Sequence, residues 1–373
     1  MTIKEIVAVV EAFAPPELQE DWDNNGLITG SPQWNCTGVL CALDATIEVV
    51  AEAAHKGCNL LLVHHPIIFK GLKCLNSADH VSAAVIAAIK KDIAIYAAHT
   101  ALDNVLLGVN GFAAEKLSLQ HIEILQPKRG ILRRLITFAP HEQAEAVRNA
   151  LFKAGAGHMG NYDECSFNSK GVGTFKAEAG ANPFVGEVGK QHQEEETKIE
   201  VVFPAYMEPQ IVQALVEAHP YEEAAYDIFA MANIHKGIGS GIIGHLPEAV
   251  DEKTFLARLT DAFQLHVIRH TAFTGKPIQK LAICGGSGAF LIKAAHTAGA
   301  DAYITADIKY HEFFGAEGRM LLADVGHYES EQFTVDLLHN LIAKKFPTFA
   351  VLKTELNTNP VHYFGQWSKV NGE

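Results

Sequence analysis

The stretch Leu60-Leu61-Leu62-Val63-His64-His65-Pro66 decides the fold of this chain. Four consecutive apolar residues that lead straight into two histidines and a proline are typical of a buried strand that ends in a polar turn. Adjacent side chains point to opposite faces of an extended strand, but Pro66 restricts the residue before it, and the resulting turn lets His64 and His65 point the same way. The stretch therefore predicts a sheet whose strand ends carry chemistry.

Two further strand ends carry residues of the same kind. The apolar run 95–98 leads into His99 and Asp103, and the run 321–323 leads, a few residues on, into His327 and Glu331. Buried strands alternate with helices in this part of the chain, which predicts a mostly parallel sheet covered by helices. Ligand crevices of such sheets lie at the carboxyl ends of the strands, so the three strand ends predict one shared site.

The spacing and the residue types favour a metal site. His327 and Glu331 are four residues apart at a helix start, so they project from one face. Imidazole and carboxylate ligands suit Zn, Fe, Mn or Co, and a set this large fits two divalent ions about 3.5–4 Å apart better than one. The alternative is that these are hydrogen-bonded structural histidines, of which a chain with 19 His has many. The expected metal ligands are His64, His65, Asp103, His327 and Glu331.

Other polar residues at predicted strand ends and turns are candidates for supporting roles. The candidates for proton transfer or for orienting a ligand are His99, Asp307 and His311. The candidates for substrate binding are Trp22, Asp23 and Asn24, in a polar turn, and Gly285, Gly286 and Ser287, in a glycine-rich strand-to-helix turn. Backbone N–H groups of such a turn can cradle an anion, but a simple tight turn explains the glycines equally well.

The pattern of elements changes in the middle of the chain. Residues 128–234 follow the order strand, helix, strand, strand, helix, strand, which is the ferredoxin-like pattern. The helix–strand alternation resumes afterwards. The fold class we expect is α/β, with a mostly parallel-sheet core domain at 1–127 and 235–373 that is interrupted by an inserted ferredoxin-like α+β domain at 128–234.

Several segments are expected to have particular local structures. Polar, glycine- or proline-containing composition predicts loops at 15–32 and 177–196, and a return crossing at 235–245. Two short strands are expected near 163–168 and 172–176, and one long helix over about 330–345.

Composition excludes some classes of protein. A net charge of −13 over 373 residues argues against a broad nucleic-acid surface, which relies on Lys and Arg. The longest apolar run, near 93–98, is too short to cross a bilayer, and residues 3–14 form an amphipathic helix rather than a signal peptide. We therefore expect a cytoplasmic protein without a membrane partner, whose six cysteines are reduced.

Several motifs of the chain resemble those of the family of GTP cyclohydrolase 1 type 2 homologues, the Nif-three-like proteins. The resemblance covers nearly the whole chain. It is carried by segments 21–27, 43–46, 63–66, 99–103, 306–311 and 324–331. Among these, the pair His64-His65 and the sequence Gly326-His327-Tyr328-Glu329-Ser330-Glu331 are specific in combination. The middle segment is similar to the insert of longer family members, which resembles PII-type and CutA-type modules.

The resemblance implies a dinuclear metal site and a ring-shaped homohexamer. By the family pattern, His65 and Asp103 would hold one ion, His64 and His327 the other, and Glu331 would bridge them. It also implies a metal-dependent hydrolase, related to GTP cyclohydrolase, that acts on a small molecule such as a nucleotide or phosphoester. The alternatives are a non-catalytic sensor of a metal or metabolite, motivated by the insert, and an oligomeric scaffold for protein interactions.

Overall fold

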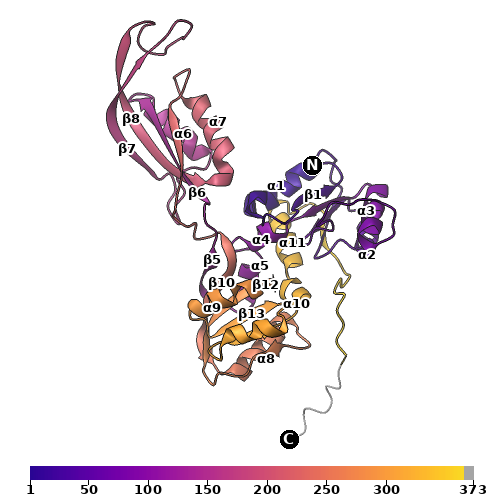
Figure 1. Cartoon of the computed structure of the whole chain (residues 1–373). Helices are drawn as coiled ribbons and strands as arrows, with labels where there is room; N and C mark the ends of the chain where they lie inside the picture. The colour runs from indigo at the N-terminus through magenta and orange to yellow at the C-terminus, as the bar shows by residue number, and fades with distance from the viewer. Residues whose placement is uncertain (365–373) are drawn as a thin grey trace. The chain divides into compact units, whose positions relative to one another are not determined.

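The computed structural model describes residues 1–364, which form two compact units (Figure 1). The core unit comprises Met1–Gln126 and the described residues from Gly237 onward. The insert unit comprises Pro127–Lys236. No helix among the described residues combines the length and the apolar character that crossing a bilayer requires.

The first sheet of the core unit has five strands in the order β1-β4-β3-β2-β15. Their bounds are β1 Gly26–Thr29, β2 Val39–Ala42, β3 Leu60–Val63, β4 Ala94–Ala97 and β15 Val351–Lys353. Strands β15, β2, β3 and β4 are parallel, and β1 pairs antiparallel with β4. Helices α2 (Ile47–His55) and α3 (His80–Lys90) bury apolar side chains against one face of this sheet.

Side-chain caps explain where three helices of this region begin. Thr2 and Glu5 form a reciprocal capping box at the start of α1 (Ile3–Phe13). The side chains of Thr46 and Asp79 accept backbone N–H groups at the starts of α2 and α3. Each cap satisfies an otherwise orphaned N–H and stabilises its helix by about 1 kcal/mol.

The second sheet of the core unit has six strands in the order β11-β14-β13-β12-β10-β5. Their bounds are β5 Gln120–Pro127, β10 Gly239–Val250, β11 Arg269–His270, β12 Ile278–Ser287, β13 Ala302–Ala306 and β14 Leu321–Asp324. Strands β12, β13 and β14 are parallel, whereas β10 runs antiparallel to β12 and β11 runs antiparallel to β14. Helices α5 (Val109–Lys116) and α8 (Glu252–Phe263) pack in one apolar cluster with this sheet, and α9 (Ile292–Thr297) packs in another.

The core unit therefore holds two mixed sheets, each with parallel central strands, rather than one mostly parallel sheet. Strand β1 lies inside the stretch expected as a loop, and β10 occupies the expected return crossing. The expected helix over 330–345 is divided into α10 (His327–Glu331) and α11 (Thr334–Lys345). Strand β1 lies at the sheet edge and its four residues are only half-buried, so it lacks the apolar run that identifies central strands.

The insert unit has one antiparallel sheet in the strand order β7-β8-β6-β9. Its elements in chain order are β6 Leu132–Pro140, α6 Ala144–Lys153, β7 Ser166–Lys176, β8 Gln191–Pro204, α7 Glu208–Ala218 and β9 Tyr226–Ala230. Both helices contribute to one apolar cluster with the sheet, whose members include Leu135, Val147, Ile199 and Ile211. Figure 1 shows α6 and α7 on the same side of β7 and β8.

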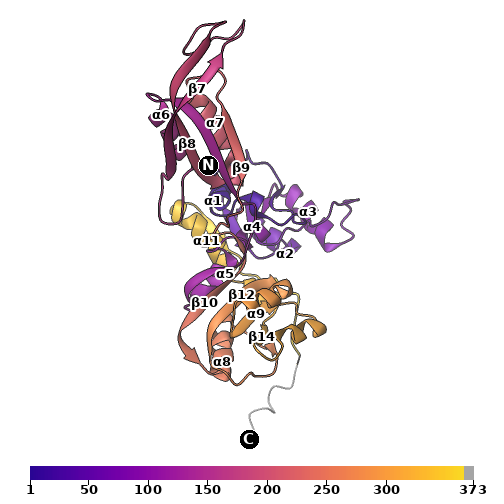
Figure 2. The same cartoon turned by 60° about the vertical axis from the view of Figure 1, so that its left-hand side comes forward.

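The long hairpin of β7 and β8 corrects two expectations. The two short strands expected near 163–168 and 172–176 are one continuous strand, and β8 begins at Gln191, inside the expected loop. In both cartoon views this hairpin extends beyond helices α6 and α7 (Figures 1 and 2). Its tip is rich in exposed polar and charged residues, so the alternation that identifies a half-buried strand is absent there.

Candidate metal centre

The strand ends that carry histidines converge within the core unit, and they come from both sheets. His64 and His65 follow β3, and the short helix α4 (His99–Asp103) follows β4 in the five-stranded sheet. Helix α10, which carries His327 and Glu331, follows β14 of the six-stranded sheet. A backbone hydrogen bond holds the segments after β3 and β4 side by side, because the N–H of His99 donates to the carbonyl of His64 at 2.9 Å.

Glu331 lies at the middle of the cluster. Its Oε2 atom lies 3.0 Å from Nε2 of His65 and 3.1 Å from Nε2 of His327. Its Oε1 atom lies 3.7 Å from Nε2 of His64, which is also 3.7 Å from Oδ1 of Asp103. Only 4% of the Glu331 surface is exposed, so this carboxylate is shared among three imidazoles away from solvent.

Three groups of side chains in the described part of the chain are arranged so that each could hold a metal ion. They are His64 with Asp103 and Glu331, His65 with His327 and Glu331, and His64 with His65 and His99. The first two groups share Glu331 and together contain all five expected ligands. They pair His64 with Asp103 and His65 with His327, whereas the family pattern led us to expect the opposite pairing.

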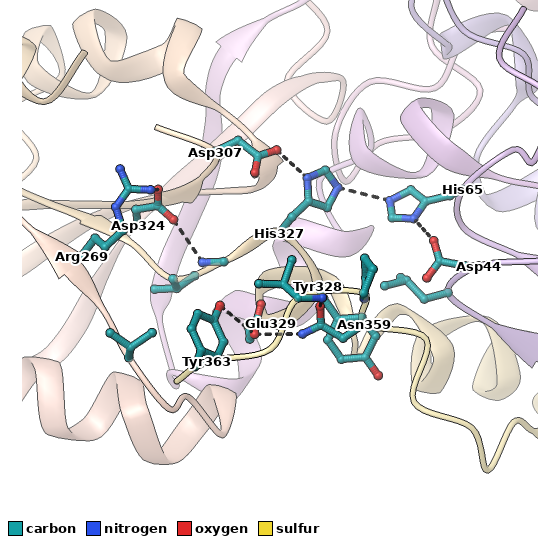
Figure 3. A pocket seen from close by; sticks show the side chains of 16 residues that line it. Asp44, His65, Arg269, Asp307, Asp324, His327, Tyr328, Glu329, Asn359 and Tyr363 are labelled. Carbon is teal, nitrogen blue, oxygen red and sulfur yellow. Dashed lines mark hydrogen bonds and ion pairs between the residues drawn. The ribbon is translucent and has the colours of Figure 1, made fainter. Parts of the chain in front are cut away.

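Carboxylates orient three of the four histidines. Nδ1 of His65 lies 2.7 Å from Asp44, Nδ1 of His327 lies 2.7 Å from Asp307, and Nδ1 of His99 lies 2.7 Å from Asp23. Figure 3 shows the first two of these pairs, with the His327 ring between Asp307 and His65. A histidine that binds a metal commonly donates its other ring N–H to a carboxylate, which fixes the tautomer and the ring orientation.

Asp44 is a site residue that our sequence reasoning did not select. It follows β2 by two residues, as His64 directly follows β3, so the strand-end argument applied to it as well. Its other oxygen accepts a hydrogen bond from the hydroxyl of Thr358. Asp44 therefore connects the orientation of His65 to the C-terminal segment of the described chain.

His64 tests whether the cluster fits a metal ion. Its side chain is fully buried, and neither ring nitrogen has a hydrogen-bond partner among the described residues. A buried polar group without a partner is costly and rare in folded proteins. A divalent ion bound by Nε2 of His64 with the carboxylates of Asp103 and Glu331 would give that nitrogen a partner, so the donor set fits a metal.

The ionisation of the cluster follows from burial and close charges. Burial lowers the pKa of His64 to about 4. Burial also disfavours charge on His65 and His327, but hydrogen bonds to the carboxylates around them outweigh it and raise the pKa to about 10 for His65 and about 9 for His327. Burial and the neighbouring Glu331 raise the pKa of Asp103 well above its usual value. Without a metal ion, the positive charges of protonated His65 and His327 therefore neutralise the buried carboxylate of Glu331.

The remaining candidates from the sequence take different positions. The hydroxyl of Ser287 donates to Asp307. The N–H groups of Gly285 and Gly286 donate to Asn110 and Ser330, so they are occupied within the protein. A Cβ atom on Gly286 would lie 2.3 Å from Oε1 of Glu331, so this glycine makes room for the central carboxylate.

The polar turn before β1 reaches the cluster from another side. Asp23 holds His99, and the ring of Trp22 makes an edge contact with the ring of His99 at 5.8 Å between centroids. Asn24 donates to the carbonyl of Ile68, on the segment that follows His65. His311 belongs to none of the three groups that could hold a metal ion, and its ring contacts Tyr310 and Phe314 instead.

A pocket of about 360 Å³ opens beside His65 and His327. Its wall includes the C-terminal segment, where Asn359 and Tyr363 donate to the carboxylate of Glu329 (Figure 3). The guanidinium of Arg269 also lines the pocket, but it forms an ion pair with Asp324 at 3.1 Å. The pocket is large enough for a small metabolite.

Comparisons with known proteins identify relatives that match nearly the whole chain. Residues 1–360 match the family described as Duf34/NIF3 (NGG1p interacting factor 3). Proteins named GTP cyclohydrolase 1 type 2 homolog from Halalkalibacterium halodurans and Bacillus subtilis are 37% and 35% identical to the chain, and each match covers at least 95% of both chains. A Bacillus cereus protein related to NIF3 has a solved structure with a TM-score of 0.86 and 34% identity, over 98% of this chain and 99% of that one.

Proposed function

The chain belongs to the Duf34/NIF3 family, and from this premise we propose that its core unit is a metal-dependent hydrolase with two divalent ions per chain. The ions would be Zn, Fe, Mn or Co, since the donors are imidazole and carboxylate. The substrate would be a nucleotide or another phosphoester. The name shared by the relatives, GTP cyclohydrolase 1 type 2 homolog, is consistent with this class.

The observation that carries the proposal is the position of Glu331. Its two oxygens face different groups, with His64 and Asp103 on the Oε1 side and His65 and His327 on the Oε2 side. A carboxylate in this position is suited to bridge two ions. Two such ions would act as Lewis acids on the attacked group and lower the pKa of water in the site.

The residues around the ligands have roles that follow from their contacts. Asp44 and Asp307 keep Nε2 of His65 and His327 directed to the centre of the cluster. His99 lies in the third group of potential ligands, and Asp23 holds its Nδ1, so its Nε2 can exchange a proton at the edge of the site. The pocket beside His327 would hold the substrate. Arg269 lines this pocket and is paired with Asp324, so part of its positive charge is already neutralised within the protein.

The test is metal content followed by turnover. We would purify the chain without a tag, measure metal per chain by elemental analysis, and compare it with Asp103→Ala and Glu331→Ala variants. About two ions in the parent and clear loss in both variants support the site. Turnover on a panel of nucleotides and phosphoesters, lost in the same variants, supports the hydrolase. A metal-loaded parent without turnover on the whole panel would reject it.

For the insert unit we propose a ferredoxin-like module of the PII or CutA type, spanning about 128–234. Its element order and its strand order β7-β8-β6-β9, with both helices on one face, support this assignment. With such a module the protein could be a sensor rather than an enzyme, and metal would then change its assembly or its affinity for a ligand. Sedimentation with and without metal tests this alternative, and also tests the ring-shaped homohexamer that we propose as the assembly.

A further inference from the structure

The insert unit contains a cavity of its own, of about 730 Å³. Strands β7 and β8 form its floor, and the segments 177–184 and 221–225 form its walls. Along β8, Glu196 and Lys198 line the cavity and alternate with Ile199, which belongs to the apolar cluster beneath the helices. Because side chains alternate along a strand, the cavity lies on the face of the sheet opposite α6 and α7.

Glu196 is a buried carboxylate in this cavity. It is only 9% exposed, and the hydroxyl of Tyr221 donates to its Oε1 at 2.8 Å. None of the ion pairs among the described residues involves Glu196. The nearby Lys198 pairs with Glu200 at 2.6 Å instead. A buried carboxylate without a cation is unfavourable, so this arrangement leaves a charge for a ligand to neutralise.

The position of Glu196 depends on a glycine in the facing strand. A Cβ atom on Gly173 would lie 2.2 Å from Oε2 of Glu196. Glycine weakens a strand interior, and a common reason for it there is the close approach of another group. Gly173 thus keeps space for the second carboxylate oxygen, which has no hydrogen-bond donor among the described residues.

Aromatic rings surround this carboxylate. The ring of Tyr221 lies 6.1 Å from the ring of Phe175 and 6.3 Å from the ring of Phe184, between centroids, and all three line the cavity. Phe184 belongs to the 177–184 wall. The N–H of Asn182 in this wall donates to Glu222 at 2.9 Å and so ties it to the 221–225 wall. Aromatic faces attract cations that lie within about 6 Å of the ring centroid.

From these contacts we propose that the cavity of the insert unit binds a small organic cation, a protonated amine. The ammonium group of the ligand would donate to Oε2 of Glu196 and lie against the rings of Phe175 and Tyr221, and the apolar part of the ligand would fill the remainder of the cavity.

The charges of the side chains that line the cavity also favour a cation over an anion. Four glutamates and three lysines line the cavity, and two of the lysines, Lys176 and Lys198, are paired with Glu178 and Glu200. The proposal is independent of the metal centre.

The experiment compares two ligands of the same shape on the full chain. Benzylamine is protonated near neutral pH, and benzyl alcohol is its neutral counterpart. Ligand-observed NMR titration should give saturable binding of benzylamine that is at least about tenfold tighter than that of benzyl alcohol, because only the amine gains the charge-assisted hydrogen bond and the ring contacts.

Variants locate the site. Glu196→Gln keeps the shape of the side chain and an acceptor for Tyr221, and it should weaken benzylamine binding by about tenfold or more. Glu195→Gln, on the same strand, is the matched control and should leave binding unchanged, because Glu195 is exposed and does not line the cavity. Phe175→Leu should weaken binding by a few-fold, by about the size of one cation–π contact. Circular dichroism of each variant verifies that it is folded.

Three results would overturn the proposal. Equal binding of the alcohol and the amine would mean a merely apolar cavity. Benzylamine binding unchanged in folded Glu196→Gln would place the amine elsewhere. Absence of benzylamine binding to the folded parent chain, including the case in which a second copy of the chain fills the cavity, would reject an amine site.

Discussion

Two buried glutamates, Glu331 in the core unit and Glu196 in the insert unit, have very different surroundings. Imidazole nitrogens lie 3.0 and 3.1 Å from Oε2 of Glu331. Glu196 instead has one hydroxyl partner, and aromatic rings line the cavity around it. Both side chains are largely buried, with 4% of Glu331 and 9% of Glu196 exposed, so a bound cation would stabilise either carboxylate. The side chains around a buried carboxylate therefore determine which kind of cation can bind beside it. Nitrogen and oxygen donors suit a metal ion, whereas the faces of phenyl and phenol rings suit an organic ammonium ion.

The largest expected effect is the loss of metal from the core unit. Glu331→Gln removes the central charge without changing the size of the side chain, and we expect metal affinity to fall by more than about 100-fold, beyond the effect usual for residues that only support a ligand. Competition with a chelator measures this. Glu329→Gln is the matched control, because this buried residue of the same helix contacts Asn359 and Tyr363 rather than the histidines. Equal loss in both variants would contradict the ligand assignment.

Acidity should weaken metal binding strongly. The pKa is raised to about 10 for His65 and to about 9 for His327, so an incoming ion must displace protons from both rings at neutral pH. Apparent affinity should therefore rise by up to about tenfold per pH unit for each displaced proton, between about pH 6 and pH 8.5. A titration of affinity against pH checks this, and a flat profile would exclude protonated histidines in the ion-free state.

The same raised pKa values determine how the stability of the ion-free protein changes with pH. Raised values in the folded state stabilise the ion-free protein below the ordinary histidine pKa of about 6.5, and this contribution disappears as the pH rises through about 9 to 10. The shift in melting temperature caused by added metal should accordingly grow with pH. A metal-induced shift that shrinks with pH would show the opposite sign.

A smaller effect on metal affinity is expected from residues that orient a metal ligand but do not bind the metal themselves. Asp44→Asn leaves a hydrogen-bonding side chain but removes the charge beside Nδ1 of His65, and we expect metal affinity to fall by about 10- to 100-fold. Asp307→Asn should act similarly through His327. Metal content after limiting dialysis measures both. If Asp44→Asn binds metal as the parent does, then Asp44 has only the structural role of holding Thr358.

The smallest expected effect compares the two units directly. Ile199→Val in the sheet of the insert unit and Ile95→Val in the five-stranded sheet each remove one fully buried methylene, at a cost of about 0.5–1.5 kcal/mol. Hydrogen exchange should show faster opening of the insert unit only in the first variant and of the core unit only in the second. Metal content should be unchanged in Ile199→Val. Loss of metal in that variant would show that the two regions are coupled.

Strand-end reasoning performed well where strands are buried on both faces. Strands β3, β4 and β14 are entirely buried, and their apolar runs ended where polar side chains enter the cluster. Strand β1 was missed because its residues are half-buried at a sheet edge, and β8 was started too late because its first residues are polar. Hydrophobic patterns report burial, so elements that are not deeply buried leave a weak signal.

The sequence by itself determined which residue types end the strands, and hence the histidines and carboxylates that could bind metal. Only the tertiary structure decided that these strand ends belong to two sheets, that Glu331 lies between His64 and His65, and that Asp44 joins the site. It also brought Glu196, Gly173 and Tyr221 together in the insert unit. The physical reason is that local patterns record which side chains are buried, whereas the neighbours of a buried charge come from segments distant in the chain and are set by packing.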